Sequence, residues 1–156
     1  MDLRAVLAHH EAGHVVADIV GGVGVGRVSV VHPVGGKTDV VGYTETDLAG
    51  LDADALRERL EPAVVGLLAG PFAEERYTGV YNGERAAADI HAAASLGTSC
   101  CPDGVDWATY ENGLSGRARQ IVNDRWSAIS DLAAELADLG EMTGTQLDAF
   151  LARRLP

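Results

Sequence analysis

The stretch from Leu3 to Val20 constrains the fold more than any other part of the chain. Apolar side chains and two histidines recur there on neighbouring turns of a helix, and no proline interrupts them. The glycines between positions 21 and 26 end the pattern. We therefore predict a helix over Leu3–Val20.

This helix carries the motif H-E-x-x-H as His10-Glu11-Ala12-Gly13-His14. Residues four apart lie on one helical face, so the two imidazoles can converge on one ion, and zinc binds such nitrogens at about 2.0–2.1 Å. Glu11 lies off that face and can reach a water at the metal without binding the metal. The motif predicts a Zn²⁺ site with His10 and His14 as ligands and Glu11 as the catalytic general base. The alternative is a pair of helical histidines beside an exposed glutamate.

The remaining sequence predicts a small sheet and further helices. Val25–His32 indicates a strand closed by Pro33, Gly35-Gly36 indicates a turn, and Asp39–Thr44 indicates a second strand. A helix is expected from Asp52 or Asp54 to about Tyr77, with a kink or break at Pro62. Further helices are expected over Glu84–Leu96 and Thr145–Leu155, and the region 105–139 is expected to form one helix or two. The chain has no internal repeat and no linker, so residues 1–156 predict a single helix-dominated α+β domain with a small sheet beside the first helix. From the start at Met1 and the caps near the C-terminus we expect a complete chain.

Composition excludes several classes of function. The 156 residues include 23 acidic and 12 basic side chains, and the net charge of −11 would repel a phosphate backbone, so we expect no nucleic-acid partner. The adjacent Cys100 and Cys101 form neither a disulfide framework nor a C-x-x-C zinc site. There is no signal-peptide pattern, and the longest apolar stretch, 63–73, contains Gly66, Gly70 and Pro71 and is too short to cross a bilayer. We expect a cytoplasmic protein without a membrane span.

Several motifs along the chain share one family pattern. They are the H-E-A-G-H sequence at 10–14 followed by Val15-Val16, the sequence Gly42-Tyr43-Thr44, the segment Gly70-Pro71-Phe72-Ala73-Glu74-Glu75, and the tail from Gln120 to Leu147. Together they resemble the peptidase domain of FtsH-type ATP-dependent zinc metalloproteases, which has a G-Y-T strand and a G-G-R-A-A-E-E helix. The resemblance implies a zincin-like metallopeptidase domain in which Gly42, Tyr43 and Thr44 bind substrate. It also implies that copies of the domain can assemble into a ring as a homo-oligomer.

The third zinc ligand is assigned through the resemblance. In FtsH-type proteases an aspartate from a later helix completes the site, and the matching position here is Asp89, although the preceding loop, 78–88, departs from the family's T-G-A-x-N-D pattern. From the residues alone, Glu74 and Glu75 stay open as ligands, because zinc commonly takes a His₂Glu set. His91 is only two residues from Asp89, so the two would not easily face one ion. We interpret His91 as a residue that lies at the surface or supports a ligand without binding the ion.

Some smaller features near the motif have plain structural interpretations. Asp18 lies four residues after His14 and could hydrogen-bond the second ring nitrogen of that histidine, or it could be an exposed carboxylate. His9 and His32 have no partner at ligand spacing, and we interpret both as structural. The segment 40–44 could be an edge strand that binds a peptide by strand addition.

The chain departs from the FtsH-type family in having no ATPase module. Gly36-Lys37-Thr38 imitates the end of a phosphate loop, but Val31 stands where that loop needs glycine, and the glycines at 22–26 do not complete G-x-G-x-x-G, so we expect no nucleotide. The predicted function is a zinc-dependent endopeptidase acting on peptides or unstructured protein segments, alone or with a separate ATPase partner. The alternatives are a non-catalytic peptide-binding or regulatory module that keeps the zinc, and a structural zinc site.

Overall fold

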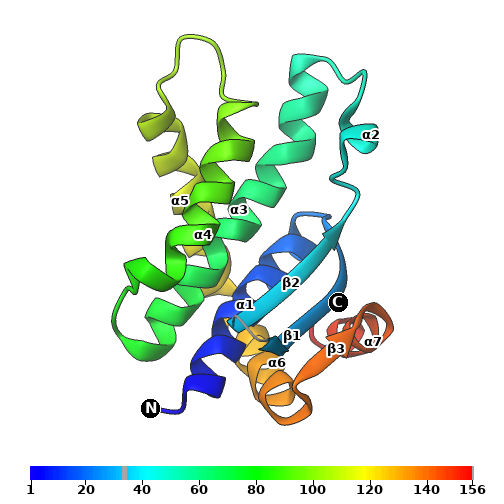
Figure 1. Ribbon diagram of the computed structural model, residues 1–156, viewed down its shortest axis with the longest axis vertical. Coiled ribbons are helices and arrows are strands. Elements are labelled where there is room, and N and C mark those ends of the chain that lie inside the picture. The colour runs from blue at the N-terminus through cyan, green and yellow to red at the C-terminus, as the bar shows by residue number, and fades with distance from the viewer. Residues whose placement is uncertain (33–34, 156) are drawn as a thin grey trace.

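The computed structural model describes residues 1–32 and 35–155, with His32 described in its backbone alone. Its central element is α1 (Leu3–Val20), which begins where the Asp2 side chain accepts a hydrogen bond from the Arg4 backbone and ends at Gly21. The predicted first helix is thus confirmed at both ends. Most of α1 is buried, because α3, α6 and the sheet pack around it (Figure 1).

The sheet has three antiparallel strands in the order β2-β1-β3. β1 (Gly24–His32) pairs with β2 (Gly35–Val41) on one side and with the short β3 (Glu141–Thr143) on the other. β2 is therefore an edge strand in the described part of the chain. Its inner face lies along α1, so residues of β2 reach the side chains of that helix (Figure 1).

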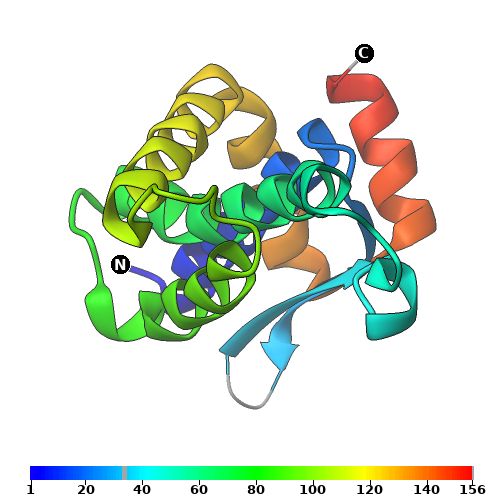
Figure 2. The same cartoon turned by 90° about the horizontal axis from the view of Figure 1, so that it is seen from above.

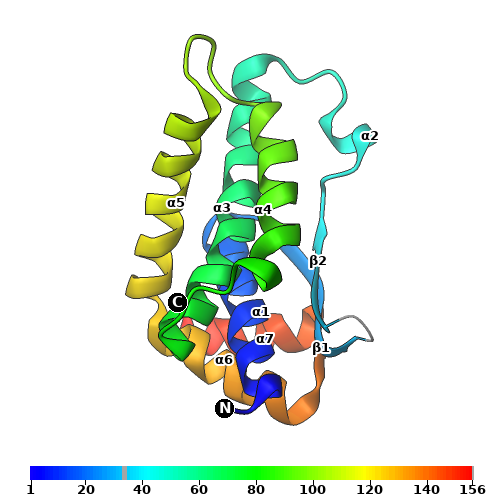
Figure 3. The same cartoon turned by 60° about the vertical axis from the view of Figure 1, so that its left-hand side comes forward.

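Six more helices complete the described fold, and the predicted helix-dominated α+β class is confirmed. They are α2 (Glu45–Leu48), α3 (Ala53–Thr78), α4 (Gly83–Thr98), α5 (Trp107–Asp124), α6 (Trp126–Leu139) and α7 (Gly144–Arg154). α3, α4 and α5 run alongside one another, whereas α6 and α7 lie at the end of the molecule that holds β3 (Figures 1 and 3). Seen from above, the β1–β2 hairpin projects from the helices (Figure 2).

The core forms around α1 and α3. Its members are mostly alanine, valine and leucine from six helices and the sheet, including the fully buried Val15, Leu68, Ile129, Leu132 and Met142. Burial of each large side chain of this kind stabilises the fold by about 1.5–3 kcal/mol. Among the described residues, no helix is long and apolar enough to cross a membrane.

Several predicted boundaries are wrong for identifiable reasons. The second strand was expected over Asp39–Thr44 but spans Gly35–Val41, because Gly42 takes a left-handed φ of +86° that ends the extended backbone and Thr44 caps α2. Gly35-Gly36 lies within this strand rather than in a turn, and Pro33, expected to close the first strand, lies outside the described residues.

The helical predictions needed smaller corrections. α3 continues through Pro62 and Pro71 without a break, because its packing against α1, α4 and α5 outweighs the hydrogen bonds that the prolines remove. The region 105–139 divides into two helices at Arg125. The short α2 and β3 were not predicted at all.

Candidate metal centre

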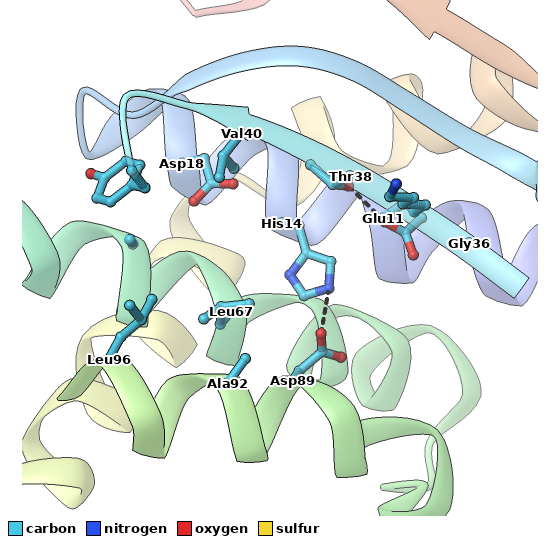
Figure 4. Close-up of a pocket in the computed structure, with 13 residues that line it drawn as sticks. Glu11, His14, Asp18, Gly36, Thr38, Val40, Leu67, Asp89, Ala92 and Leu96 are labelled. Atoms are coloured by element: carbon cyan, nitrogen blue, oxygen red, sulfur yellow. Dashed lines mark hydrogen bonds and ion pairs between the residues drawn. The ribbon is translucent and has the colours of Figure 1, made fainter. Parts of the chain in front are cut away.

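Helix α1 places the two histidines of the motif side by side in the interior. The residues His10 and His14 are 5% and 6% exposed, and the centroids of their rings lie 4.8 Å apart. Asp89 on α4 faces both rings, with its Oδ2 3.0 Å from Nε2 of His10. Its Oδ1 lies 3.5 Å from Nε2 of His14 (Figure 4). The three residues offer ligand atoms that all lie within 4.8 Å of one another. The structure thus brings together the three predicted ligands.

The second nitrogen of each ring is held by a different partner. Nδ1 of His14 lies 2.8 Å from the Gly66 carbonyl oxygen, which can only accept, so this nitrogen donates its hydrogen there. Nδ1 of His10 lies 2.9 Å from Oε2 of Glu74. These contacts fix both rings with Nε2 toward Asp89, the arrangement in which metal-binding histidines are usually oriented.

The donor set fits a zinc ion. Two imidazole nitrogens and one carboxylate are ligands that zinc accepts, and catalytic zinc sites characteristically have three protein ligands where structural sites have four. The outward nitrogens are already bonded to Glu74 and Gly66, so a cation bound by the Nε2 atoms and Asp89 would leave no buried ring nitrogen without a partner. Neither cysteine belongs to this group.

Asp89 shifts the pKa of both His10 and His14, and both histidines shift the pKa of Asp89. Burial acts to lower the pKa of His14, but the adjacent Asp89 carboxylate outweighs it and raises that pKa to about 10. The pKa of His10 is also raised, because hydrogen bonds to Asp89 and Glu74 exceed the effect of burial. For Asp89, burial acts to raise the pKa, yet hydrogen bonds from both histidines hold it well below its usual range. The carboxylate is thus kept ionised beside two basic rings.

Glu74 and Glu75, the alternative ligands, lie elsewhere. Glu74 is buried on the Nδ1 side of His10 and also accepts a hydrogen bond from Nε of Arg85 at 2.7 Å. Glu74 therefore orients the His10 ring from the side opposite Asp89. Burial acts to raise the pKa of Glu74, but His10 and Arg85 together lower it. Glu75 points away and pairs with Arg119 at 2.8 Å.

The other histidines behave as interpreted where they are described. His91 is exposed on α4. The ring of His9 stacks on Tyr77 with centroids 3.7 Å apart, and its Nδ1 lies 2.8 Å from the Ala5 carbonyl, so its role is structural. The side chain of His32 lies outside the described part of the chain.

Glu11 is held next to the cluster by the sheet. It is 4% exposed, and its Oε2 accepts a hydrogen bond from Oγ1 of Thr38 on β2 at 2.6 Å (Figure 4). Gly36 on the same strand leaves room for it, because a Cβ at that position would lie 2.2 Å from Oε1 of Glu11. The exposed glutamate of the alternative interpretation is therefore wrong.

A cavity of about 350 Å³ opens beside these groups. Its lining includes Glu11, His14 and Asp89 together with side chains from α3, α4 and β2 (Figure 4). Of the three residues predicted to bind substrate, Tyr43 lines this cavity, whereas Gly42 and Thr44 do not. The hydroxyl of Tyr43 donates to the Arg59 carbonyl at 2.8 Å.

Both interpretations of Asp18 are wrong. Its carboxylate does not bond to His14, because the Gly66 carbonyl occupies Nδ1 of that ring, and the residue is only 4% exposed rather than lying on the outer surface. It lines the cavity instead (Figure 4). The i, i+4 spacing from His14 was the available signal that Asp18 belongs to this region.

Sequence reasoning also missed the supporting residues. Glu74 was considered only as a ligand, and Thr38 only as part of a false phosphate loop. Gly66 and Gly70 were noted as interruptions of an apolar stretch, yet a Cβ at Gly70 would lie 2.3 Å from Cε1 of His14. No spacing rule connects these positions with the motif, since the packing of α3 and β2 on α1 brings them there.

The fold and the site define an α+β protein with a buried His–His–Asp cluster and a glutamate beside it. No known protein-family model matches the chain, and a search of curated proteins found no match.

Proposed function

We propose that this chain is a zinc-dependent peptidase in which His10, His14 and Asp89 hold the ion and Glu11 is the general base. The observation that carries the proposal is the convergence of two Nε2 atoms on Asp89 beside the same cavity that Glu11 lines. Each ring has its other nitrogen bonded, which supports a metal-binding role over a chance pair of histidines.

The chain's own residues supply the proton transfers. A zinc ion in such a site polarises a peptide carbonyl and lowers the pKa of water toward neutrality. Glu11, with one carboxylate oxygen bonded to Thr38, has the other oxygen available to take a proton from the attacking water and pass it to the leaving amine. The Thr38 hydroxyl fixes the carboxylate while Gly36 lets β2 approach it closely.

The edge strand β2 supports a peptide substrate. Within the described sheet its outer edge has no partner, and Val40 lines the cavity from this strand. An extended peptide can add to such an edge by backbone hydrogen bonds and place alternate side chains toward the cavity. Tyr43 then lies at the end of the strand beside the bound chain.

The resemblance to FtsH-type peptidase domains supports the same reaction. It extends the proposal to a homo-oligomeric ring and to a separate ATPase partner that delivers unfolded protein in a cytoplasmic setting. A non-catalytic peptide-binding module is the second candidate, since the cavity and the edge strand would serve it equally. The buried and oriented Glu11 favours catalysis, because binding alone does not require a base at that position.

Two variants test the proposal. Elemental analysis of the purified protein supplied with zinc should give about one ion per chain, and His10→Ala should lose it. Glu11→Gln should keep the zinc and lose peptidase activity on unstructured peptides, because an amide cannot accept the proton. Equal activity in Glu11→Gln would exclude the assigned base, and retained zinc without activity in the wild type would favour the binding module.

A further inference from the structure

The cavity extends past the metal cluster to a carboxylate that the proposed chemistry does not use. Asp18 follows His14 by one helical turn on α1, about 6 Å along the axis, and its side chain faces the cavity (Figure 4). The residue is 4% exposed. Among the described residues none makes a hydrogen bond or ion pair with its side-chain oxygens.

The surrounding residues provide space for this carboxylate but no counterion. A Cβ at Gly66 would lie 1.8 Å from Oδ1 of Asp18, so α3 accommodates the carboxylate with a glycine. Two basic residues share the cavity lining, and both have other partners: Nζ of Lys37 lies 3.1 Å from Oδ1 of Asp39, and the ring of His14 is held between the Gly66 carbonyl and Asp89. Burying an ionised carboxylate without a partner is costly, so a bound cation would relieve an unfavourable arrangement.

Part of the cavity wall is apolar. It includes Ala63 and Leu67 of α3 and Ala92 and Leu96 of α4. Leu67, Ala92 and Leu96 lie across the cavity from Asp18 (Figure 4). An occupant that contacts this apolar wall and also pairs with the Asp18 carboxylate needs an aliphatic stem and a cationic end. Lysine, with its four-carbon stem, and arginine are the side chains with that chemistry.

We propose that this cavity is the specificity pocket of the peptidase, and that it takes a Lys or Arg side chain from the residue next to the scissile bond, with Asp18 pairing with its cationic head. The inference rests on the proposed peptidase function and adds the substrate class. A leucine would fill the apolar wall equally well but would leave Asp18 without a partner. A metal ion at Asp18 is disfavoured, because among the described residues Asp18 belongs to no group of three or more potential ligands.

Two further properties agree with a cationic substrate. Burial raises the pKa of Asp18 to about 7 against an opposing effect of His14, as expected for a carboxylate that lacks a counterion. The net charge of −11 would also attract basic peptides toward the molecule.

Cleavage of a peptide series by the zinc-supplied protein tests the pocket directly. The series varies one position among Lys, Arg, norleucine, Leu and Glu, and mass spectrometry identifies the bond cut. Norleucine matches the lysine stem without the charge. We expect kcat/KM for Lys and Arg peptides to exceed that for norleucine by about tenfold or more, as for a charge-assisted bond in a buried site.

The matched variants are Asp18→Asn and Asp138→Asn. Each removes one negative charge, but Asp138 is exposed on α6 and does not line the cavity. Asp18→Asn should reduce the preference for Lys over norleucine to within about threefold while keeping its zinc and losing no thermal stability, and Asp138→Asn should keep the full preference. If the Asp18→Asn protein failed to fold, the comparison of Lys with norleucine peptides in the wild type would still test the proposal.

Binding separates this inference from the peptidase proposal. Fluorescence anisotropy with the same peptides and the Glu11→Gln protein measures affinity without turnover. Cleavage without a preference for basic residues would overturn the pocket assignment and leave the peptidase proposal intact. Absent cleavage with Lys-dependent binding that Asp18→Asn abolishes would support the pocket and overturn the peptidase. Absent cleavage and absent charge dependence of binding would overturn both.

Discussion

At the scale of single residues, two buried carboxylates near the cluster have opposite environments. Glu74 has a partner for each oxygen, His10 on one side and Arg85 on the other. Asp18 has none among the described residues, although it is nearly as buried. Because a buried charge stabilises only when it is paired, removing the charge should have opposite effects at the two positions.

Glu74→Gln should weaken both the fold and the zinc site. The amide retains one oxygen acceptor for two donors, so either His10 or Arg85 loses its bond, and we expect a loss of about 1–3 kcal/mol in unfolding free energy. Loss of an orienting partner typically lowers metal affinity by about 10–100-fold. Urea unfolding and competitive zinc titration measure the two effects.

The neighbouring Glu75→Gln is the control for that variant. Glu75 pairs with Arg119 near the surface, where such ion pairs contribute about 0–1 kcal/mol to stability. Because Glu75 does not contact either histidine, the Glu75→Gln protein should bind zinc as tightly as the wild type. Zinc loss in Glu75→Gln together with full retention in Glu74→Gln would contradict the assigned roles.

Asp18→Asn should stabilise the zinc-free protein in a pH-dependent manner. Burial raises the pKa of Asp18 from 3.8 to about 7, so the folded state binds more protons than the unfolded state between these values. The wild type therefore loses stability as the pH rises from about 4 to 7, and the variant does not incur this loss. Urea unfolding in EDTA should show equal stabilities near pH 4 and a variant more stable by roughly 1–4 kcal/mol at pH 8. An advantage for Asp18→Asn that is the same at both pH values would show that ionisation is not its cause.

How far the sequence predicted the site depends on how local each relation is. His10, Glu11 and His14 lie within one and a half turns, so helical spacing alone placed them together. Asp89 is on another helix and was reached through the family resemblance. The roles of Glu74 and Asp18 arise from contacts between α1 and α3, and helical spacing does not describe such contacts.

At the scale of elements, the site depends on how closely α1 and α3 cross. A Cβ at Gly13 would lie 2.6 Å from the Ala73 Cβ, and the carbonyl of Gly66 reaches the His14 ring. Gly70 lies directly against that ring. Glycine and alanine at the crossing therefore set the position of His14 relative to Asp89.

Gly70→Ala tests this dependence. The new methyl group would lie 2.4 Å from Nε2 of His14, so the ring must leave its present position beside Asp89. We expect zinc affinity to fall at least tenfold and peptidase activity to fall with it. Gly113→Ala is the control, since nothing lies within 4 Å of a Cβ there and an alanine in helix α5 should stabilise by about 0.5–1 kcal/mol. Normal zinc binding by Gly70→Ala would show that the helix crossing can relax.

Elements with strong local signals were predicted well, and those that need distant partners were not. α1 has a cap, an unbroken pattern and terminal glycines, and both of its ends were correct. β3 has three residues and exists because β1 pairs with it across more than a hundred positions. The same applies to β2, whose start at Gly35 is set by its pairing with His32 rather than by its own glycine-rich sequence.

At the scale of the whole molecule, α4 is a helix whose buried residues are all small. Only Ala86, Ala93 and Gly97 of its 16 residues are buried. Its packing is mainly against α3 and α5, and its connections to the cluster are the Asp89 carboxylate and the Arg85–Glu74 pair. A shared zinc ion would therefore join α1 to α4, two helices with little other contact.

Zinc removal should accordingly loosen α4 before the rest of the fold. Ligand binding stabilises the native state by about 4 kcal/mol at a thousandfold excess over Kd, and this stabilisation is lost when the zinc is chelated. Hydrogen exchange with and without EDTA should show faster exchange in α4, while α6, with Ile129, Leu132 and Leu136 fully buried, should change little. Asp89→Asn should make α4 exchange rapidly even when zinc is present, because the ion then lacks its α4 ligand. Equal acceleration in α4 and α6 would instead mean that the metal stabilises one cooperative unit, since local opening requires a helix that can separate from the core on its own.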